Sequence, residues 1–196
     1  MGKVMAVVNQ KGGVGKTTTT VNLGACLALL GQRVLIIDID PQGNATSGLG
    51  VDKESLEQCI YDVLIEDLEL EKTILPTEIE DLFIVPSAIR LAGAEIELVP
   101  AISREMKLKR ALAGVRDKYD FVLIDSPPSL GLLTINALTA ADSVLVPIQC
   151  EYYALEGLSQ LMNSIRLVQK HLNPDLKLEG VLLTMFDART NLAIQV

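Results

Sequence analysis

Residues 9–20 read NQKGGVGKTTTT, and this stretch decides the fold class. It lies between a short apolar run and a pattern typical of a helix. Glycines in such a place let backbone N–H groups turn inward around an anion, and the N-terminus of the following helix adds a partial positive charge. The stretch is therefore predicted to bind phosphate. It contains two lysines, Lys11 and Lys16, although one is enough for that task.

The end of the stretch, Gly15-Lys16-Thr17, matches the end of the phosphate-loop pattern GxxxxGK[ST]. In that pattern the lysine reaches the β- and γ-phosphates of a nucleotide, and the hydroxyl is a ligand of Mg²⁺. Lys16 is therefore predicted to act in catalysis and in binding, and Thr17 to bind the metal. The residues predicted to contact ATP are Lys11, Gly12, Gly13, Val14, Gly15, Lys16, Thr17 and Thr18.

A dinucleotide-binding loop of the form GxGxxG is the alternative interpretation of these glycines. Residues 13–15 begin that pattern, and Asp38 stands in the region where such folds place an acidic residue. However, Thr18 occupies the position of the third glycine, and Lys16 has no function in a dinucleotide loop. The phosphate loop of a nucleotide-hydrolysing protein is therefore favoured.

The composition is that of an ordinary soluble protein, with 196 residues of which 49% are apolar and 21% charged. The net charge of −8 argues against a protein that coats nucleic acid with its whole surface, but it allows a local basic patch. No apolar run approaches the roughly 18 residues of a membrane-spanning helix. Cys26, Cys59 and Cys150 are too scattered for a disulfide or zinc framework, so a cytoplasmic protein is expected.

Short apolar runs alternate with helical patterns along the chain. Strands are expected at 3–9, 33–38, 82–87, 121–126, 143–148 and 177–184, and helices around 16–30, 54–65, 88–98, 103–117, 131–141 and 154–171. The expected strands are almost entirely apolar, as in a parallel sheet buried on both faces. The pattern predicts an α/β fold of the P-loop NTPase class, with a doubly wound, mostly parallel sheet and helices on both faces. Residues 1–196 are expected to form a single domain.

Two segments do not follow this alternation. Residues 40–50, DPQGNATSGLG, are rich in Gly, Asn and Ser and are predicted to form a loop. The last residues, MFDARTNLAIQV, look like the opening of a helix that does not complete. Because a sheet of this type normally goes on to cover its last strand, we expect a C-terminal segment to be missing.

Three aspartates stand at the ends of expected strands. Asp38 and Asp40 fall on the same side of the second strand and should face the nucleotide at the carboxyl edge of the sheet. Asp125 ends the apolar run FVLID, an arrangement that holds Mg²⁺, here through a water molecule. Strand-end aspartates also cap helices, so a structural role is the alternative. The following loop 126–131, SPPSLG, is stiffened by two prolines and is predicted to move as a unit with nucleotide state.

The phosphate loop departs from its usual pattern in one respect. Gln10 stands where the first glycine belongs and Lys11 follows it, so the loop reads KGGVGKT. This form resembles the ParA/MinD family of P-loop ATPases, in which two subunits enclose two ATP molecules. The resemblance implies that Lys11 is catalytic and crosses to the partner's nucleotide, where a cation offsets charge as an arginine finger does. It also implies that Asp40 orients the attacking water and that Asp38 lies near the water shell of Mg²⁺.

Longer segments narrow the resemblance to the chromosome-partitioning ParA proteins of the Soj type. They are DIDPQGNATSGLG, DSPPSLGLLTINAL, PIQCEYYALEGLSQL and EGVLLTMFDART. This resemblance implies an ATP-dependent homodimer, non-specific DNA binding at the nucleoid, and slow hydrolysis stimulated by a ParB/Spo0J-type adaptor. Arg189 is the predicted DNA contact, and the basic residues of 104–110 are interpreted as the outer face of a helix. Met185 and Asp187 are expected to border the adenine.

Two other functions fit the same phosphate loop. A MinD-like membrane-positioning ATPase would carry its membrane helix at the C-terminus, but MinD differs at both switch loops. A P-loop amide-forming synthetase shares KGGVGK-like loops, but it would need a substrate pocket with its own polar residues, and the sequence indicates none. DNA is therefore the expected partner, and a membrane is not.

Overall fold

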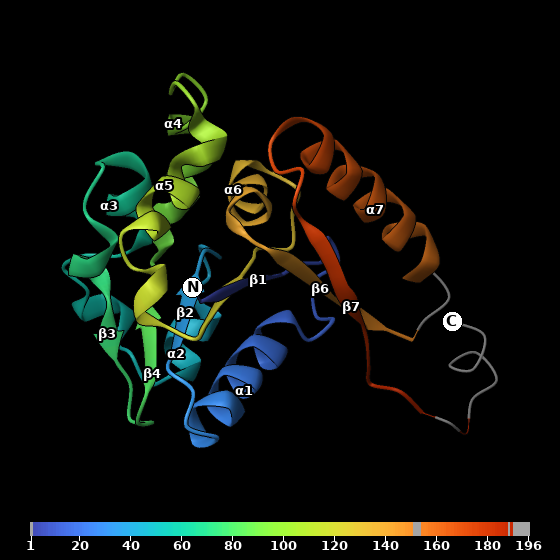
Figure 1. The fold of residues 1–196 in the computed structure, drawn as a ribbon, viewed down its shortest axis with the longest axis horizontal. Helices are drawn as coiled ribbons and strands as arrows, with labels where there is room; N and C mark the ends of the chain where they lie inside the picture. The colour runs from blue at the N-terminus through green and yellow to red at the C-terminus, as the bar shows by residue number, and fades with distance from the viewer. Residues whose placement is uncertain (1, 151–153, 188, 190–196) are drawn as a thin grey trace.

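The computed structural model describes residues 2–150, 154–187 and 189. In this part of the chain, strands form one sheet in the order β3-β4-β2-β5-β1-β6-β7 (Figure 1). Every neighbouring pair is parallel except β3 and β4, which are antiparallel. The predicted mostly parallel sheet is confirmed. The strands are β1 (Lys3–Val7), β2 (Val34–Asp38), β3 (Leu75–Pro76), β4 (Leu82–Val85), β5 (Phe121–Asp125), β6 (Ser143–Gln149) and β7 (Lys177–Thr184).

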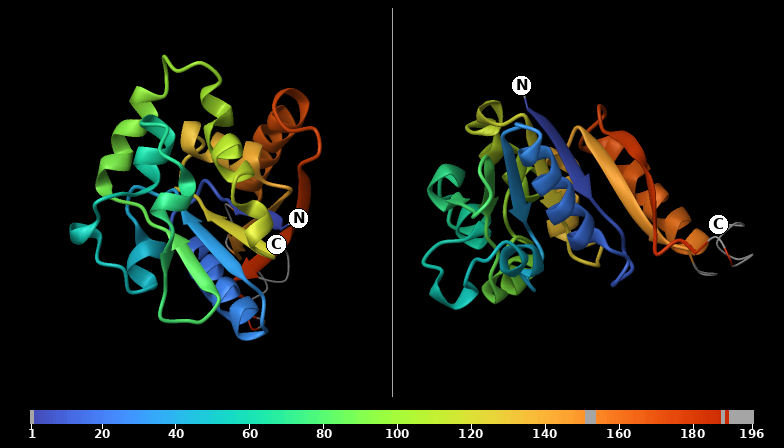
Figure 2. Two further views of the ribbon diagram at one scale, coloured as in Figure 1. Left: turned by 60° about the vertical axis from the view of Figure 1, so that its left-hand side comes forward. Right: turned by 90° about the horizontal axis from the view of Figure 1, so that it is seen from below.

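Helices cover both faces of the sheet, as predicted (Figures 1 and 2). Side chains alternate along β1, so that Val4 and Ala6 join one apolar core and Met5 joins the other. The core around Met5 is closed by α1 (Lys16–Leu29) and α2 (Asn44–Gly48). The larger core is closed by α3 (Ile60–Ile65), α4 (Ala94–Glu97), α5 (Lys107–Ala113), α6 (Leu132–Ala140) and α7 (Ala154–His171).

Small side chains let α1 lie close against the sheet. Thr20, Gly24 and Ala28 recur every four residues on its buried face. A Cβ atom at Gly24 would lie only 2.8 Å from Cδ1 of Ile36 in β2. This close packing fixes the N-terminus of α1 at the carboxyl edge of the parallel strands, where the phosphate loop enters it.

Several expected helices are shorter or more broken than predicted. The segments 54–65, 88–98 and 103–117 each contain a short α-helix with 3₁₀ turns beside it, at Lys53–Ser55, Ile89–Gly93, Arg104–Met106 and Arg116–Lys118. The prediction of a loop over 40–50 was wrong, because α2 forms inside it. Gly43 precedes α2 with φ of +61°, a left-handed turn that glycine accepts without strain and that redirects the chain into the helix.

The prediction that the last strand is buried on both faces was wrong. In the described part of the chain, β7 ends the sheet beside β6, and Leu178, Leu182 and Leu183 are each at least 40% exposed. The helix expected after residue 184 falls mostly on residues 188 and 190–196, which lie outside the described residues.

Two further observations bear on the class of protein. Among the described helices, none has the length and apolar character needed to cross a bilayer. Cys26, Cys59 and Cys150 are all free thiols.

Candidate functional site

The phosphate loop connects β1 to α1 and turns through two left-handed glycines. Gly13 has φ of +74° and Gly15 has φ of +87°. L-residues with a Cβ atom rarely adopt these values, so the glycines are needed for the shape of the loop. Their turns bring the backbone around the N-terminus of α1, which is the geometry that binds an anion.

Side chains from elsewhere in the sequence anchor this loop. Asn9 donates from Nδ2 to the carbonyl oxygen of Pro147 in β6 at 2.6 Å, and its Oδ1 accepts from the amide of Lys11 at 3.0 Å. On the other side, Oγ1 of Thr184 in β7 donates to the carbonyl oxygen of Val14 at 2.9 Å. The loop is thus held to β6 and β7. The sequence reasoning missed both anchors, although Asn9 stands at the start of the deciding stretch.

A cavity of about 300 Å³ opens over the loop and the N-terminus of α1. It brings together the phosphate loop, the segment after β2 and the loop after β5. Of the predicted ATP contacts, Lys11 and Val14 do not line this cavity but a neighbouring one of about 240 Å³. The residues lining the larger cavity are Gly12, Gly13, Gly15, Lys16, Thr17, Thr18, Asp40, Gln42, Asn44, Pro128 and Met185. Of the two residues expected to border the adenine, Met185 lines this cavity and Asp187 does not, and the expectation itself stays a prediction.

Hydroxyl and carboxylate oxygens meet at the floor of this site. Oγ1 of Thr17 donates to Oδ2 of Asp125 at 2.7 Å, and Oγ1 of Thr20 donates to Oδ1 of the same carboxylate at 3.2 Å. Burial raises the pKa of Asp125 to about 7, and the nearby charge of Asp38 adds to the effect. Thr20 is a further residue that the sequence reasoning missed.

These oxygens fit a magnesium ion that is also held by a nucleotide. Mg²⁺ prefers oxygen ligands and is commonly bound by one or two protein groups together with substrate phosphates. Among the described residues there is no group of three or more His, Cys, Asp and Glu that could hold a metal alone. A cation beside Thr17 and Asp125 would therefore depend on phosphate oxygens for its remaining ligands.

Lys16 lies across the inside of the loop. Its Nζ donates to the carbonyl oxygen of Lys11 at 3.1 Å, and the residue is only 6% exposed. Burial lowers the pKa of Lys16, while the charges of Asp125 and Asp40 act in the opposite direction. The Lys16 ammonium is buried close to the N-terminus of α1. A polyphosphate is a suitable ligand at this point, because its negative charge would interact favourably with both positive groups.

The structure separates the two aspartates that follow β2. Asp40 reaches the cavity, and its Oδ1 accepts from the amide of Gln42 at 2.9 Å. Asp38 lies behind it, fully buried, and accepts hydrogen bonds from the backbone amide and hydroxyl of Thr46 at 2.8 and 2.7 Å. Burial raises the pKa of Asp38 to about 6. Asp40 is therefore the aspartate of this pair that lines the cavity.

The predicted DNA contact is engaged in an ion pair. Arg189 is 89% exposed and donates to Asp187 through Nε at 2.9 Å and through Nη2 at 2.7 Å. Of the basic residues in 104–110, Arg104 pairs with Glu105 at 3.0 Å and Lys107 pairs with Asp67. Much of the positive charge in these segments is thus neutralised locally.

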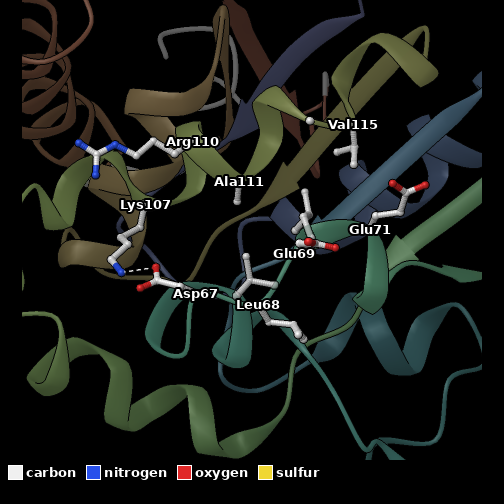
Figure 3. A pocket seen from close by; sticks show the side chains of 11 residues that line it. Asp67, Leu68, Glu69, Glu71, Lys107, Arg110, Ala111 and Val115 are labelled. Atoms are coloured by element: carbon white, nitrogen blue, oxygen red, sulfur yellow. Dashed lines mark hydrogen bonds and ion pairs between the residues drawn. The ribbon is translucent and has the colours of Figure 1, made fainter.

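A larger cavity of about 390 Å³ lies away from the phosphate loop, between α5 and the segment after α3 (Figure 3). Its acidic wall holds Asp67 and Glu71, which pair with Lys107 and with Lys118. With Glu69 and Arg110 included, three acidic and two basic side chains line this cavity, so it lacks the excess of positive charge that a phosphate ligand needs. The smaller cavity over the phosphate loop is therefore the candidate nucleotide site.

Comparison with known proteins agrees with this geometry. Residues 2–178 match a family model described as an AAA domain. The chain is 69% identical over 196 residues to the sporulation initiation inhibitor protein Soj of Bacillus subtilis strain 168, covering all of this chain and 78% of Soj. It is 56% identical to the chromosome partitioning protein ParA of Myxococcus xanthus strain DK1622, covering all of this chain and 69% of ParA.

A solved structure shares the same fold. The crystal structure of cobyrinic acid a,c-diamide synthase from Mycobacterium smegmatis with bound ATP analog and magnesium is 47% identical and superposes with a TM-score of 0.95. The match covers all of this chain and 80% of that chain. The deviant phosphate loop, the aspartates at the sheet edge and these relatives lead to one assignment: the chain belongs to the ParA/Soj family of chromosome-partitioning proteins.

Proposed function

We propose that this protein binds Mg²⁺ and ATP in the cavity over the phosphate loop and hydrolyses the ATP as a dimer. The observation that carries the proposal is the division of the two lysines between two cavities. Lys16 lines the cavity that opens onto α1, together with Thr17 and Asp40. Lys11, in the same loop, lines the neighbouring cavity instead. We infer from this division that Lys16 acts on the nucleotide of its own subunit and Lys11 on that of a second copy of the chain.

Each residue then has a defined task. Backbone N–H groups of the loop and the Lys16 ammonium hold the phosphates, and Thr17 and Asp125 hold the metal. When bound, Mg²⁺ neutralises charge on the β- and γ-phosphates. Asp40 orients the attacking water from the edge of the cavity. Lys11 of the partner adds a positive charge to the γ-phosphate only when the dimer forms, so that hydrolysis depends on assembly.

The protein is proposed to act in DNA partitioning at the nucleoid. The ATP-bound dimer binds DNA without sequence preference, and a ParB/Spo0J-type adaptor stimulates an otherwise slow hydrolysis. Similarity to Soj and ParA supports this part of the proposal, and Arg189, which is exposed but paired with Asp187, is the candidate contact with DNA. Each chain has a net charge of −8, so binding to DNA depends on a local basic face, and dimerisation would double the area of that face.

A mixture of two inactive variants tests the site and the dimer together. Lys11→Ala should bind ATP without hydrolysing it, and Asp40→Ala should do the same. If Lys11 acts on the partner's nucleotide, a mixed dimer has one site with both groups intact and should regain phosphate release. Heterodimers that are confirmed by cross-linking but release no phosphate would show that Lys11 acts within its own subunit.

A second candidate function is amide formation, because the superposed solved structure is named as a diamide synthase. The higher identity to Soj favours partitioning, at 69% against 47%. Phosphate release that requires only ATP, Mg²⁺, DNA and adaptor would support partitioning, whereas release that requires a carboxylic acid and a nitrogen donor would support amide formation. Co-sedimentation with DNA and with liposomes separates partitioning from a MinD-like membrane function.

A further inference from the structure

The Asp38 carboxylate organises the chain that carries Asp40. Its Oδ1 accepts from the amide of Asp40 at 3.1 Å, and its Oδ2 accepts from the amide and the hydroxyl of Thr46 at 2.8 and 2.7 Å. Asp38 and Thr46 are both completely buried and neither lines the nucleotide cavity. Both carboxylate oxygens are therefore occupied by the segment that follows β2.

The hydroxyl of Thr46 joins three parts of the fold. It donates its proton to Asp38 at the end of β2, and it accepts from the amide of Ser87, just beyond β4, at 2.9 Å. Thr46 itself lies in α2. With one donated and one accepted hydrogen bond, the hydroxyl is fixed in orientation, and α2 is fixed against the ends of two neighbouring strands.

This arrangement determines where Asp40 can lie. The turn after it is tight, with the amide of Gln42 bonded to Oδ1 of Asp40 at 2.9 Å and the amide of Gly43 bonded to its carbonyl oxygen at 2.9 Å. One end of this turn is held by Asp38 through the amide of Asp40. The other end runs directly into α2, which Thr46 holds. The hydrogen bond between Asp38 and Thr46 therefore connects the two ends of the turn.

We propose that Thr46 is a positioning residue for ATP hydrolysis, acting through Asp38 to hold Asp40 at the edge of the nucleotide cavity. The proposal rests on the function proposed above for Asp40. In this proposal Asp38 supports the loop that carries Asp40. The sequence had led us to expect Asp38 near the water shell of Mg²⁺. Neither Thr46 nor Asp38 lines the cavity, and both are proposed to act by placing Asp40, which does.

The size of the effect follows from the geometry of the turn. Removing the Thr46 hydroxyl takes one donor from a buried carboxylate and leaves the Ser87 amide without its acceptor, so that α2 is no longer fixed. Misplacing a catalytic group by about 1 Å costs up to ~10²-fold in rate. The contacts that bind ATP come from the phosphate loop and remain. We therefore expect a loss in kcat of about 10- to 100-fold with little change in KM for ATP.

The test compares variants of Thr46 in the natural protein, with phosphate release measured against ATP and against Mg²⁺. Thr46→Val keeps the shape of the side chain and removes the hydroxyl, whereas Thr46→Ser keeps the hydroxyl. Thr46→Val should lower kcat by about 10- to 100-fold, with KM and the Mg²⁺ concentration for half-maximal rate within about threefold of wild type, and Thr46→Ser should restore most of the rate. If Thr46→Val does not fold, Thr46→Ala replaces it in the comparison with serine.

Thr139→Val is the matched control. Thr139 is also fully buried, but its Oγ1 has no hydrogen-bond partner among the described residues. The control variant should hydrolyse ATP at the wild-type rate, which shows that loss of a buried threonine hydroxyl does not by itself impair turnover. An equal loss in both variants would overturn the positioning role.

A double variant separates positioning from metal binding. If Thr46 acts through Asp38, adding Thr46→Val to Asp38→Asn should cause no further loss in kcat, because the two residues form one unit. Wild-type turnover by Thr46→Val would overturn the proposal. So would a tenfold or greater rise in the Mg²⁺ requirement of Asp38→Asn that Thr46→Val does not share. A wild-type protein that releases no phosphate would instead overturn the proposed function, and this inference with it.

Discussion

Replacing Gly131 with alanine should weaken the start of α6, the helix that follows the proline-containing loop 126–131. A Cβ atom at Gly131 would lie 2.2 Å from Oε1 and 2.6 Å from Oε2 of Glu95, so this carboxylate would have to move. In the native fold the carboxylate accepts from the amides of Leu132 at 2.8 Å and Leu133 at 3.2 Å. The backbone itself allows alanine, since φ at Gly131 is −81°.

The magnitude follows from the interactions that Glu95 would lose. A side-chain cap at a helix N-terminus is worth about 0.5–2 kcal/mol. The charge of the carboxylate near the helix dipole adds about 0.3–1 kcal/mol. The glutamate side chain can swing away, so steric strain adds little. Gly131→Ala should therefore lower the free energy of unfolding by about 1–2.5 kcal/mol, and Glu95→Ala should lower it by a similar amount.

Urea unfolding followed by circular dichroism measures this effect, with unchanged m-values as the check that the midpoint reports stability. In the Glu95→Ala background, Gly131→Ala should change stability by less than about 0.5 kcal/mol, because no carboxylate remains to displace. Gly114→Ala is the control, since a Cβ atom there meets nothing within 4 Å. Additive losses at the two positions, or a Gly131→Ala variant as stable as the wild type, would refute the reasoning.

Three further predictions concern the site and its surroundings. Lys16→Ala should abolish ATP binding in an equilibrium assay with a fluorescent analogue while leaving the circular dichroism spectrum unchanged; retained affinity would contradict the assignment of this lysine. Arg189→Ala should lower the slope of log affinity against log salt by ~0.9 on two unrelated DNA duplexes, and Asp187→Asn should strengthen DNA binding because it releases the guanidinium; equal slopes would place the DNA surface elsewhere. Because burial raises the pKa of Asp125 from 3.8 to about 7, the folded state holds a proton that the unfolded chain has released. The melting temperature of the Mg²⁺-free protein should therefore fall as pH rises through that interval and then level off, and an Asp125→Asn variant that kept the full slope would contradict this cause.

The parts of the fold that the sequence predicted are those with a local physical cause. Apolar runs alternating with helical patterns predicted the parallel sheet, since strands buried on both faces need apolar side chains at every position. The glycines at 13 and 15, followed by Lys16 and Thr17, predicted the phosphate loop because their conformational freedom and charge are properties of the residues themselves. The deviation from the usual phosphate-loop pattern at Gln10 and Lys11 could also be identified from the sequence, since it concerns the order of residues in one loop.

The contacts that hold the site came only from the tertiary structure. Asn9 bonds to Pro147, Thr46 to the amide of Ser87, and Glu95 to the start of α6. Each pair is separated by more than 30 positions in the chain. Polar groups that are taken out of water need partners, but the partner depends on which helices and strands become neighbours in the fold, and the spacing of residues in the sequence does not reveal this.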